Sequence, residues 1–247
     1  MKKFISYLLS VVYYLLYHTT LVVFQAIQWF CFNLFGYKAH RKSADAMFFF
    51  LVLNTYILGT RYKIENLHKI PTNVPLIIVA NHQSMFDFTT IGWFMRKISP
   101  KFIGKIELRK GWGGISYFLT HGGGELIDRK NPKQSLPALE KVAQDIEVNK
   151  QSIVIFPEGT RNNTTGKPKP FKEKGLRILC KFAPSAYVVP ITINNSWKMT
   201  RWGNFPLSIG NKIIFTIHNS IPVKAMLFDE IFEKTEQSII QAIFPDI

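Results

Sequence analysis

The stretch LIIVANHQSMFD, residues 76–87, decides the fold, because five apolar residues run directly into a polar segment. An unbroken apolar run of this length is typical of a strand that is buried on both faces of a parallel sheet. The next apolar stretch, residues 86–97, is expected to be a helix. A strand followed at once by a helix is the repeating unit of α/β proteins, and sites are built where such strands end. We therefore predict an α/β fold with a functional site near residues 81–87.

The rest of the chain from residue 60 onward repeats this alternation without an internal repeat. We expect further strands at residues 101–103, 125–127, 152–156, 187–193 and 212–217. Further helices are expected at residues 112–120, 134–149, 175–182 and 223–242. The predicted catalytic unit, residues 60–247, is one α/β domain with a largely parallel central sheet flanked by helices.

The N-terminal part, residues 1–59, contains two apolar segments, 4–35 and 44–58, joined by a basic link at 38–42. The first is long enough to cross a bilayer and lacks the cleavage pattern of a signal peptide. Its polar residues nevertheless fall on one stripe of a helix, which a span surrounded by lipid would not need. The stripe consists of Ser6, Ser10, His18, Gln25 and Gln28.

We therefore favour a two-helix hairpin that lies in one leaflet of a membrane. Four cations are expected to contact lipid phosphates: Lys3, Lys38, Arg41 and Lys42. A two-pass span and a pair of ordinary buried helices are the alternatives. The prediction is a membrane-associated protein whose active site faces the cytoplasm.

Charge and composition narrow the class of partner. The 31 Lys and Arg against 16 Asp and Glu give a net charge of +15, which favours an anionic partner. The 47% hydrophobic content favours a lipid surface over nucleic acid, and no nucleic-acid-binding motif is present. The two cysteines are not clustered and the six histidines are scattered, so we expect no metal site and no redox cofactor.

His82 and Asp87 are the first candidates for chemistry. Their separation lets a carboxylate in the first helical turn reach back to one imidazole nitrogen while the other faces a substrate. A histidine held in this way can act as a general base on an alcohol, which contributes about 10²–10⁴-fold to a rate. The alternative is that Ser84 and Asp87 form only a capping box at the start of the helix.

The second candidate segment is FPEGTR, residues 156–161, which also follows an expected strand. Gly159 permits a tight turn, and Arg161 can bind a phosphate with two hydrogen bonds. Glu158 can accept a hydrogen bond from a hydroxyl or hold a basic side chain. A solvated turn is the alternative if this segment is taken alone.

Four segments together resemble the lysophosphatidic acid acyltransferase family, glycerophospholipid acyltransferases with an asparagine-histidine-four residues-aspartate motif. These are Asn81 to Asp87, the stretch GELIDR at 124–129, FPEGTR at 156–161 and VVPI at 188–191. The resemblance covers about residues 60–220. It implies an N-terminal two-helix membrane motif joined to an α/β domain, with His82 as the catalytic base and Asp87 as the residue that orients it.

The resemblance also implies the substrates and the residues that bind them. The acceptor, 1-acylglycerol 3-phosphate, is expected to contact Lys105, Arg129, Glu158, Gly159, Thr160 and Arg161. Turn geometry, rather than the resemblance, suggests that a backbone N–H near Gly159 or in the helix after Ser84 would stabilise the oxyanion. The donor is an acyl thioester, either acyl-CoA or acyl carrier protein. The alternatives are glycerol 3-phosphate or another lysolipid as acceptor, or a catalytically silent lipid-binding protein of the same fold.

Overall fold

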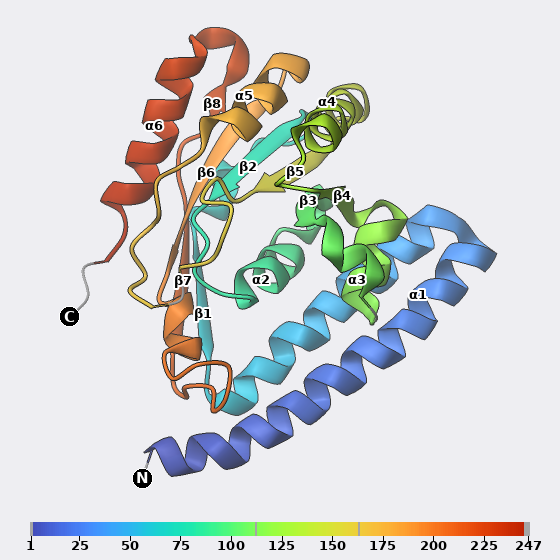
Figure 1. Ribbon diagram of the computed structural model, residues 1–247, viewed down its shortest axis with the longest axis vertical. Helices are drawn as coiled ribbons and strands as arrows, with labels where there is room; N and C mark the ends of the chain where they lie inside the picture. The colour runs from blue at the N-terminus through green and yellow to red at the C-terminus, as the bar shows by residue number, and fades with distance from the viewer. Residues whose placement is uncertain (1, 112, 163, 245–247) are drawn as a thin grey trace.

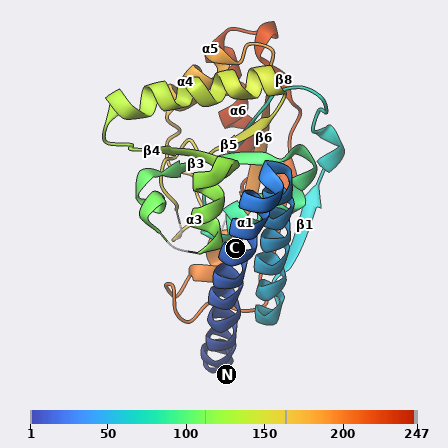
Figure 2. The ribbon, with the colours of Figure 1, turned by 90° about the vertical axis from the view of Figure 1, so that its right-hand side faces the viewer.

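The computed structural model describes residues 2–111, 113–162 and 164–244 (Figures 1 and 2). Its strands are β1 (Arg61–Glu65), β2 (Leu76–Ala80), β3 (Pro100–Lys105), β4 (Gly124–Ile127), β5 (Ser152–Ile155), β6 (Tyr187–Asn194), β7 (Lys212–Ile217) and β8 (Ile221–Pro222). Its helices are α1 (Lys2–Thr55), α2 (Phe86–Phe94), α3 (Gly114–Phe118), α4 (Pro132–Asn149), α5 (Glu173–Phe182) and α6 (Phe228–Gln241).

The described strands form one sheet in the order β1-β7-β6-β2-β5-β3-β4, with β8 paired to β6. Every pair is parallel except β6–β7 and β6–β8. β2 lies at the centre and all five of its residues are buried, as the apolar run predicts. The expectation of a largely parallel α/β sheet is confirmed.

Helices cover both faces of the sheet (Figure 1). α1, α2 and α3 pack on one face, where Phe48, Phe86 and Phe118 are buried in one core. α4, α5 and α6 pack on the other face, where Leu139, Leu179 and Ile239 are buried in a second core. The loops that leave the carboxyl ends of the parallel strands are the place where a site is expected in such a fold.

α1 is a hairpin of two helical arms that meet at Gly36, whose backbone has a φ of 75° (Figure 1). A positive φ favours glycine, so the bend lies where the sequence permits it. The second arm buries Met47, Phe48 and Leu51 in the core. This arm shares one hydrophobic core with the sheet, so the packing does not mark a boundary at residue 59. The division into residues 1–59 and 60–247 stays a prediction.

Most of the polar stripe of the first arm faces the sheet domain, but His18 is exposed. Ser10 Oγ accepts a hydrogen bond from Leu207 N at 2.8 Å, and Gln25 Oε1 accepts one from Gly113 N at 2.7 Å. Gln28 is fully buried. The opposite side exposes large apolar residues such as Leu8, Leu15 and Phe30. Among the described helices, α1 is the one whose length and apolar composition would allow it to cross a membrane.

Arg41 corrects one expectation about the basic link. Its side chain is buried, and its guanidinium donates to Pro100 O at 2.9 Å and to Asp45 Oδ1 at 3.0 Å. Arg41 therefore fastens the hairpin to the start of β3 and is not an exposed cation of the link.

Several element bounds differ from the sequence-based expectations. β1 was not predicted, because RYKIE alternates polar and apolar residues, as an edge strand does. The helix expected at 223–242 begins only at Phe228, since Ile221–Pro222 pairs with β6 and Val223–Ala225 forms a 3-10 turn. The expected helix 112–120 begins at Gly114, and Trp112 lies outside the described residues.

Candidate active site

The candidate site begins where the chain leaves the end of β2. Asn81 fixes this exit, because its side-chain amide donates to Ile193 O at 2.9 Å and accepts from Ile193 N at 2.7 Å. These two bonds tie the residue before His82 to the neighbouring strand β6. His82 is thereby held at the carboxyl edge of the sheet, at the place predicted from the sequence.

His82 and Asp87 are in direct contact. His82 Nδ1 and Asp87 Oδ2 are 2.9 Å apart. The same oxygen accepts hydrogen bonds from Gln83 N at 2.7 Å and Ser84 N at 2.8 Å. Asp87, in the first turn of α2, thus binds the backbone that leads into the helix and also orients the imidazole, so a structural and a catalytic role of this residue are compatible.

Asp87 is completely buried and its second oxygen is also bonded. Oδ1 accepts from Ser196 Oγ at 2.5 Å and from Ser84 Oγ at 3.3 Å. Ser196 lies in the turn after β6 and is fully buried. A carboxylate surrounded by donors in this way is fixed in position and remains ready to stabilise an imidazolium.

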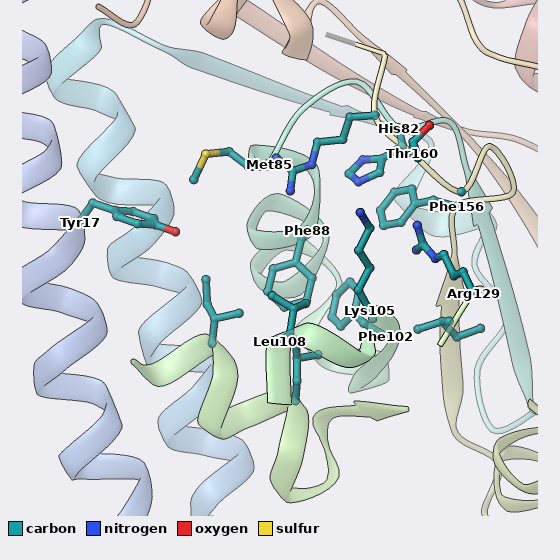
Figure 3. Close-up of a pocket in the computed structure, with 16 residues that line it drawn as sticks. Tyr17, His82, Met85, Phe88, Phe102, Lys105, Leu108, Arg129, Phe156 and Thr160 are labelled. Carbon is teal, nitrogen blue, oxygen red and sulfur yellow. The ribbon is translucent and has the colours of Figure 1, made fainter. Parts of the chain in front are cut away.

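The imidazole of His82 is held against an aromatic ring. It stacks on Phe156, with ring centroids 4.1 Å apart and an interplanar angle of 18°. The His82 side chain is 16% exposed, and within the described part of the chain its Nε2 makes no hydrogen bond. Nε2 is therefore the nitrogen that is free to meet a substrate, in the cavity shown in Figure 3.

Glu158 has a different place from the one that the resemblance implies. It is buried, and its oxygens accept hydrogen bonds from His82 N at 2.6 Å and Lys169 N at 2.7 Å. Burial, the largest cause, raises the pKa of Glu158 to about 7, while these two bonds oppose the rise. Glu158 does not line the cavity beside His82. It holds the backbone of His82, and this position corrects its expected contact with the acceptor.

The cavity beside His82 has a volume of about 400 Å³. Five of the six predicted substrate-binding residues line it: Lys105, Arg129, Gly159, Thr160 and Arg161. Three of these carry positive charge and come from separate segments of the chain: Lys105 ends β3, Arg129 follows β4 and Arg161 follows β5. Figure 3 shows the side chains of Lys105 and Arg129 directed toward the ring of Phe156, next to His82. The loops at the strand ends thus gather a cluster of cations around the free nitrogen of His82.

The remainder of the cavity is apolar. Its walls are formed by Met85, Phe88, Phe102, Ile103, Leu108, Ile115 and Leu119. These side chains come from α2 and the residue before it, from β3 and from the segment around α3. The cavity therefore has a cationic end at His82 and an apolar end that reaches toward the hairpin, as a phosphorylated lipid or an acyl chain requires.

The structure adds site residues that the sequence reasoning missed. Tyr17, from the first arm of α1, directs its hydroxyl into the cavity (Figure 3). Lys169 Nζ donates to Thr160 Oγ1 at 2.9 Å and to Arg161 O at 3.0 Å, which braces the FPEGTR loop. Gly159, with a φ of 73°, donates its N–H to Phe156 O at 3.0 Å, so that N–H is not free for an oxyanion. Ser84 N is likewise bonded to Asp87.

Residues 61–194 match the family model described as Acyltransferase, and this match spans more than half of the chain. The chain belongs to the acyltransferase family. The matched region includes His82, Asp87 and the three cations of the cavity. The family resemblance read from the motifs is confirmed. Tyr17 and Ser196 lie outside the matched region.

Curated relatives of this acyltransferase carry specific names. The 1-acyl-sn-glycerol-3-phosphate acyltransferase alpha of Ovis aries is 29% identical over 144 residues, 57% of this chain and 47% of the relative. The 1-acyl-sn-glycerol-3-phosphate acyltransferase of Haemophilus influenzae is 28% identical over 169 residues, 66% of this chain and 67% of the relative. The chain spans about half the length of the mammalian relatives that it matches.

A solved structure shares the whole fold of this acyltransferase. The crystal structure of the 1-acyl-sn-glycerophosphate (LPA) acyltransferase PlsC from Thermotoga maritima superposes with a TM-score of 0.80 and 24% sequence identity. The match covers 98% of this chain and 95% of the other, so it includes the hairpin α1. The likeness shows a common architecture for the hairpin and the α/β domain.

Proposed function

We propose that this acyltransferase moves a fatty acyl group from an acyl thioester to the free hydroxyl of 1-acylglycerol 3-phosphate, which gives phosphatidic acid for phospholipid synthesis. One observation carries the proposal: a single cavity holds the free nitrogen of an Asp-bound histidine, a cluster of cations and an apolar wall. The names of the relatives support the choice of acceptor.

The cations give the acceptor its orientation. The phosphate would lie among Lys105, Arg129 and Arg161, where charge-assisted hydrogen bonds are strong. Thr160 would add a hydroxyl contact. The glycerol hydroxyl then lies beside His82 Nε2, while the acyl chains lie along the apolar wall. Holding both reactants in one cavity supplies much of the rate.

The reaction proceeds by direct attack. As the hydroxyl oxygen bonds to the thioester carbonyl carbon, its proton passes to His82 Nε2. Asp87 stabilises the resulting imidazolium through Nδ1. When the tetrahedral intermediate collapses, the carbon–sulfur bond breaks and His82 returns the proton to the departing thiolate. The proposal assigns no step to a metal or redox cofactor, and the donor is acyl-CoA or acyl carrier protein.

The hairpin would keep this site at a membrane surface. The outer side of α1 exposes Phe4, Leu8, Leu15, Phe30 and Phe35, an apolar strip that suits the interior of one leaflet. Tyr17 lines the cavity from the same helix, so the cavity lies beside the lipid-facing surface. A lysolipid could then enter from the leaflet, with the site on the cytoplasmic side.

The test is acyl transfer from a labelled acyl thioester to 1-acylglycerol 3-phosphate in detergent. His82→Ala and Asp87→Asn should lower kcat by at least about 10³-fold, because one removes the base and the other its charged partner. His68→Ala and Asp229→Asn are matched controls at exposed positions and should keep full activity.

Other outcomes would redirect the proposal. Faster transfer to glycerol 3-phosphate, or to a lysolipid without a phosphomonoester, would reassign the acceptor. A folded wild-type protein that acylates none of these acceptors would instead indicate a silent lipid-binding protein.

A further inference from the structure

A second cavity lies at the opposite edge of the sheet from His82. It has a volume of about 800 Å³ and is lined by residues at the starts of β2 and β5, Leu76 and Ser152, and by the turn before β3. Its other wall is the start of the second arm of α1, just after the bend at Gly36. The cavity is therefore separate from the one that contains His82.

The lining of this cavity is strongly basic. Four lysines reach it from three different segments: Lys38, Lys42, Lys97 and Lys150. Arg41 and Asp45 also line it, but they pair with each other and cancel in charge. None of the four lysines forms an ion pair with another described residue. Like charges gathered without acidic partners repel one another, and an anion would relieve this repulsion.

The dipole of a helix adds to the positive electrostatic potential of this cavity. The second arm of α1 begins after Gly36, so Lys38, Arg41 and Lys42 lie in its first two turns. Cations are unfavourable at this positive end of a helix, whereas a bound phosphate is favourable there. Arg41 supplies an independent observation: it is 6% exposed, and its Nε has no hydrogen-bond partner among the described residues.

The neighbouring surface indicates where the anion comes from. Leu34 and Phe35, directly before the bend, are 66% and 74% exposed. Exposed apolar side chains next to lysines are typical of a protein surface at the level of lipid headgroups. We propose that this cavity binds the phosphate of an anionic glycerophospholipid in the membrane, at a site that does not take part in acyl transfer.

Vesicle flotation tests the proposal with the full chain. The partition coefficient is measured with vesicles of phosphatidylcholine alone and with vesicles of four parts phosphatidylcholine to one part phosphatidylglycerol. Lys97→Glu/Lys150→Glu reverses two charges of the cavity and leaves α1 unchanged. Lys224→Glu/Lys234→Glu changes the net charge equally at exposed positions near and in α6.

We expect the wild type and the α6-side control to prefer the anionic vesicles by about tenfold or more, which corresponds to a few lysines at a charged surface. The cavity variant should lose most of this preference, bind phosphatidylcholine as before, and keep its acyl-transfer activity in detergent. The proposal would be overturned if both variants lost this preference for anionic vesicles equally, or if the cavity variant kept it in full.

A second experiment distinguishes a membrane lipid from a soluble phosphate as the ligand of the cavity. Glycerol 3-phosphate or inorganic phosphate is added to the anionic vesicles, with chloride at matched ionic strength as the control. If the site takes a membrane lipid, the soluble phosphates should lower the partition coefficient no more than chloride does. A selective loss with soluble phosphate would show that the cavity binds a free phosphate and would overturn the lipid assignment.

Discussion

Ser196 Oγ donates a hydrogen bond to Asp87 Oδ1 at 2.5 Å, although the two residues are 109 positions apart in the chain. The other oxygen of the same carboxylate contacts His82 Nδ1 at 2.9 Å. Ser196 therefore helps to fix the carboxylate that orients the imidazole, without lining the cavity itself.

Replacement of Ser196 by alanine should lower kcat by about tenfold, because a buried carboxylate loses a charge-assisted hydrogen bond worth roughly 1.5–3 kcal/mol. The KM for the acceptor should stay unchanged, since Ser196 does not touch the cavity. The control in these steady-state measurements is Ser185→Ala, because Ser185 lies just before the amino end of β6, away from the catalytic cavity. A rise in KM with unchanged kcat would contradict this role.

Each cation of the catalytic cavity should contribute to binding of the phosphate. Lys105→Ala, Arg129→Ala and Arg161→Ala are each expected to raise the KM for 1-acylglycerol 3-phosphate by about tenfold or more, the loss of one charge-assisted hydrogen bond. Lys133→Ala, which lies outside this cavity, should have little effect. The assignment fails if the same variants weaken an acceptor without phosphate equally.

Gln28 should anchor the first arm of α1 to the domain. It is fully buried, donates to Gly114 O at 3.0 Å and lies 3.0 Å from His40 Nε2. Gln28→Ala removes both of these buried contacts, so we expect a loss of about 1–3 kcal/mol in the free energy of unfolding. Denaturant unfolding in detergent measures it, with the exposed Thr19→Ala as the control. Equal stability of the two variants would show that the arm is held by apolar contacts alone.

Glu158 should make stability depend on pH. Burial raises its pKa in the folded protein from an ordinary 4.5 to about 7, so the folded state binds more protons than the unfolded state between these values. The free energy of unfolding contributed by this group is therefore fully present below about pH 4.5 and is lost as the pH rises through 7.

Glu158→Gln removes this titration. Its stability relative to the wild type should therefore improve from about pH 5 to about pH 8 in denaturant unfolding experiments. A constant difference between the two proteins across this range would show that the carboxyl group is ionised throughout, held so by its two backbone N–H donors.

The sequence determined the elements whose signals are local. The apolar run at 76–80 predicts β2, and the positions of His82 and Asp87 predict their contact, because five residues and one helical turn set the geometry. The hairpin was also predictable, since two apolar segments flank a basic link. β1 was not, because its alternating residues give only a weak signal at an edge of the sheet.

Only the tertiary structure decided which distant residues complete the site. The strand order brings Ser196 to Asp87 and places the cations at the carboxyl ends of β3, β4 and β5 in one cavity. Packing of α1 brings Tyr17 into that cavity, and the turn after β5 sends Glu158 inward to the backbone of His82. Such contacts depend on sheet order and on how buried groups find partners, and neither is encoded in the spacing along one segment.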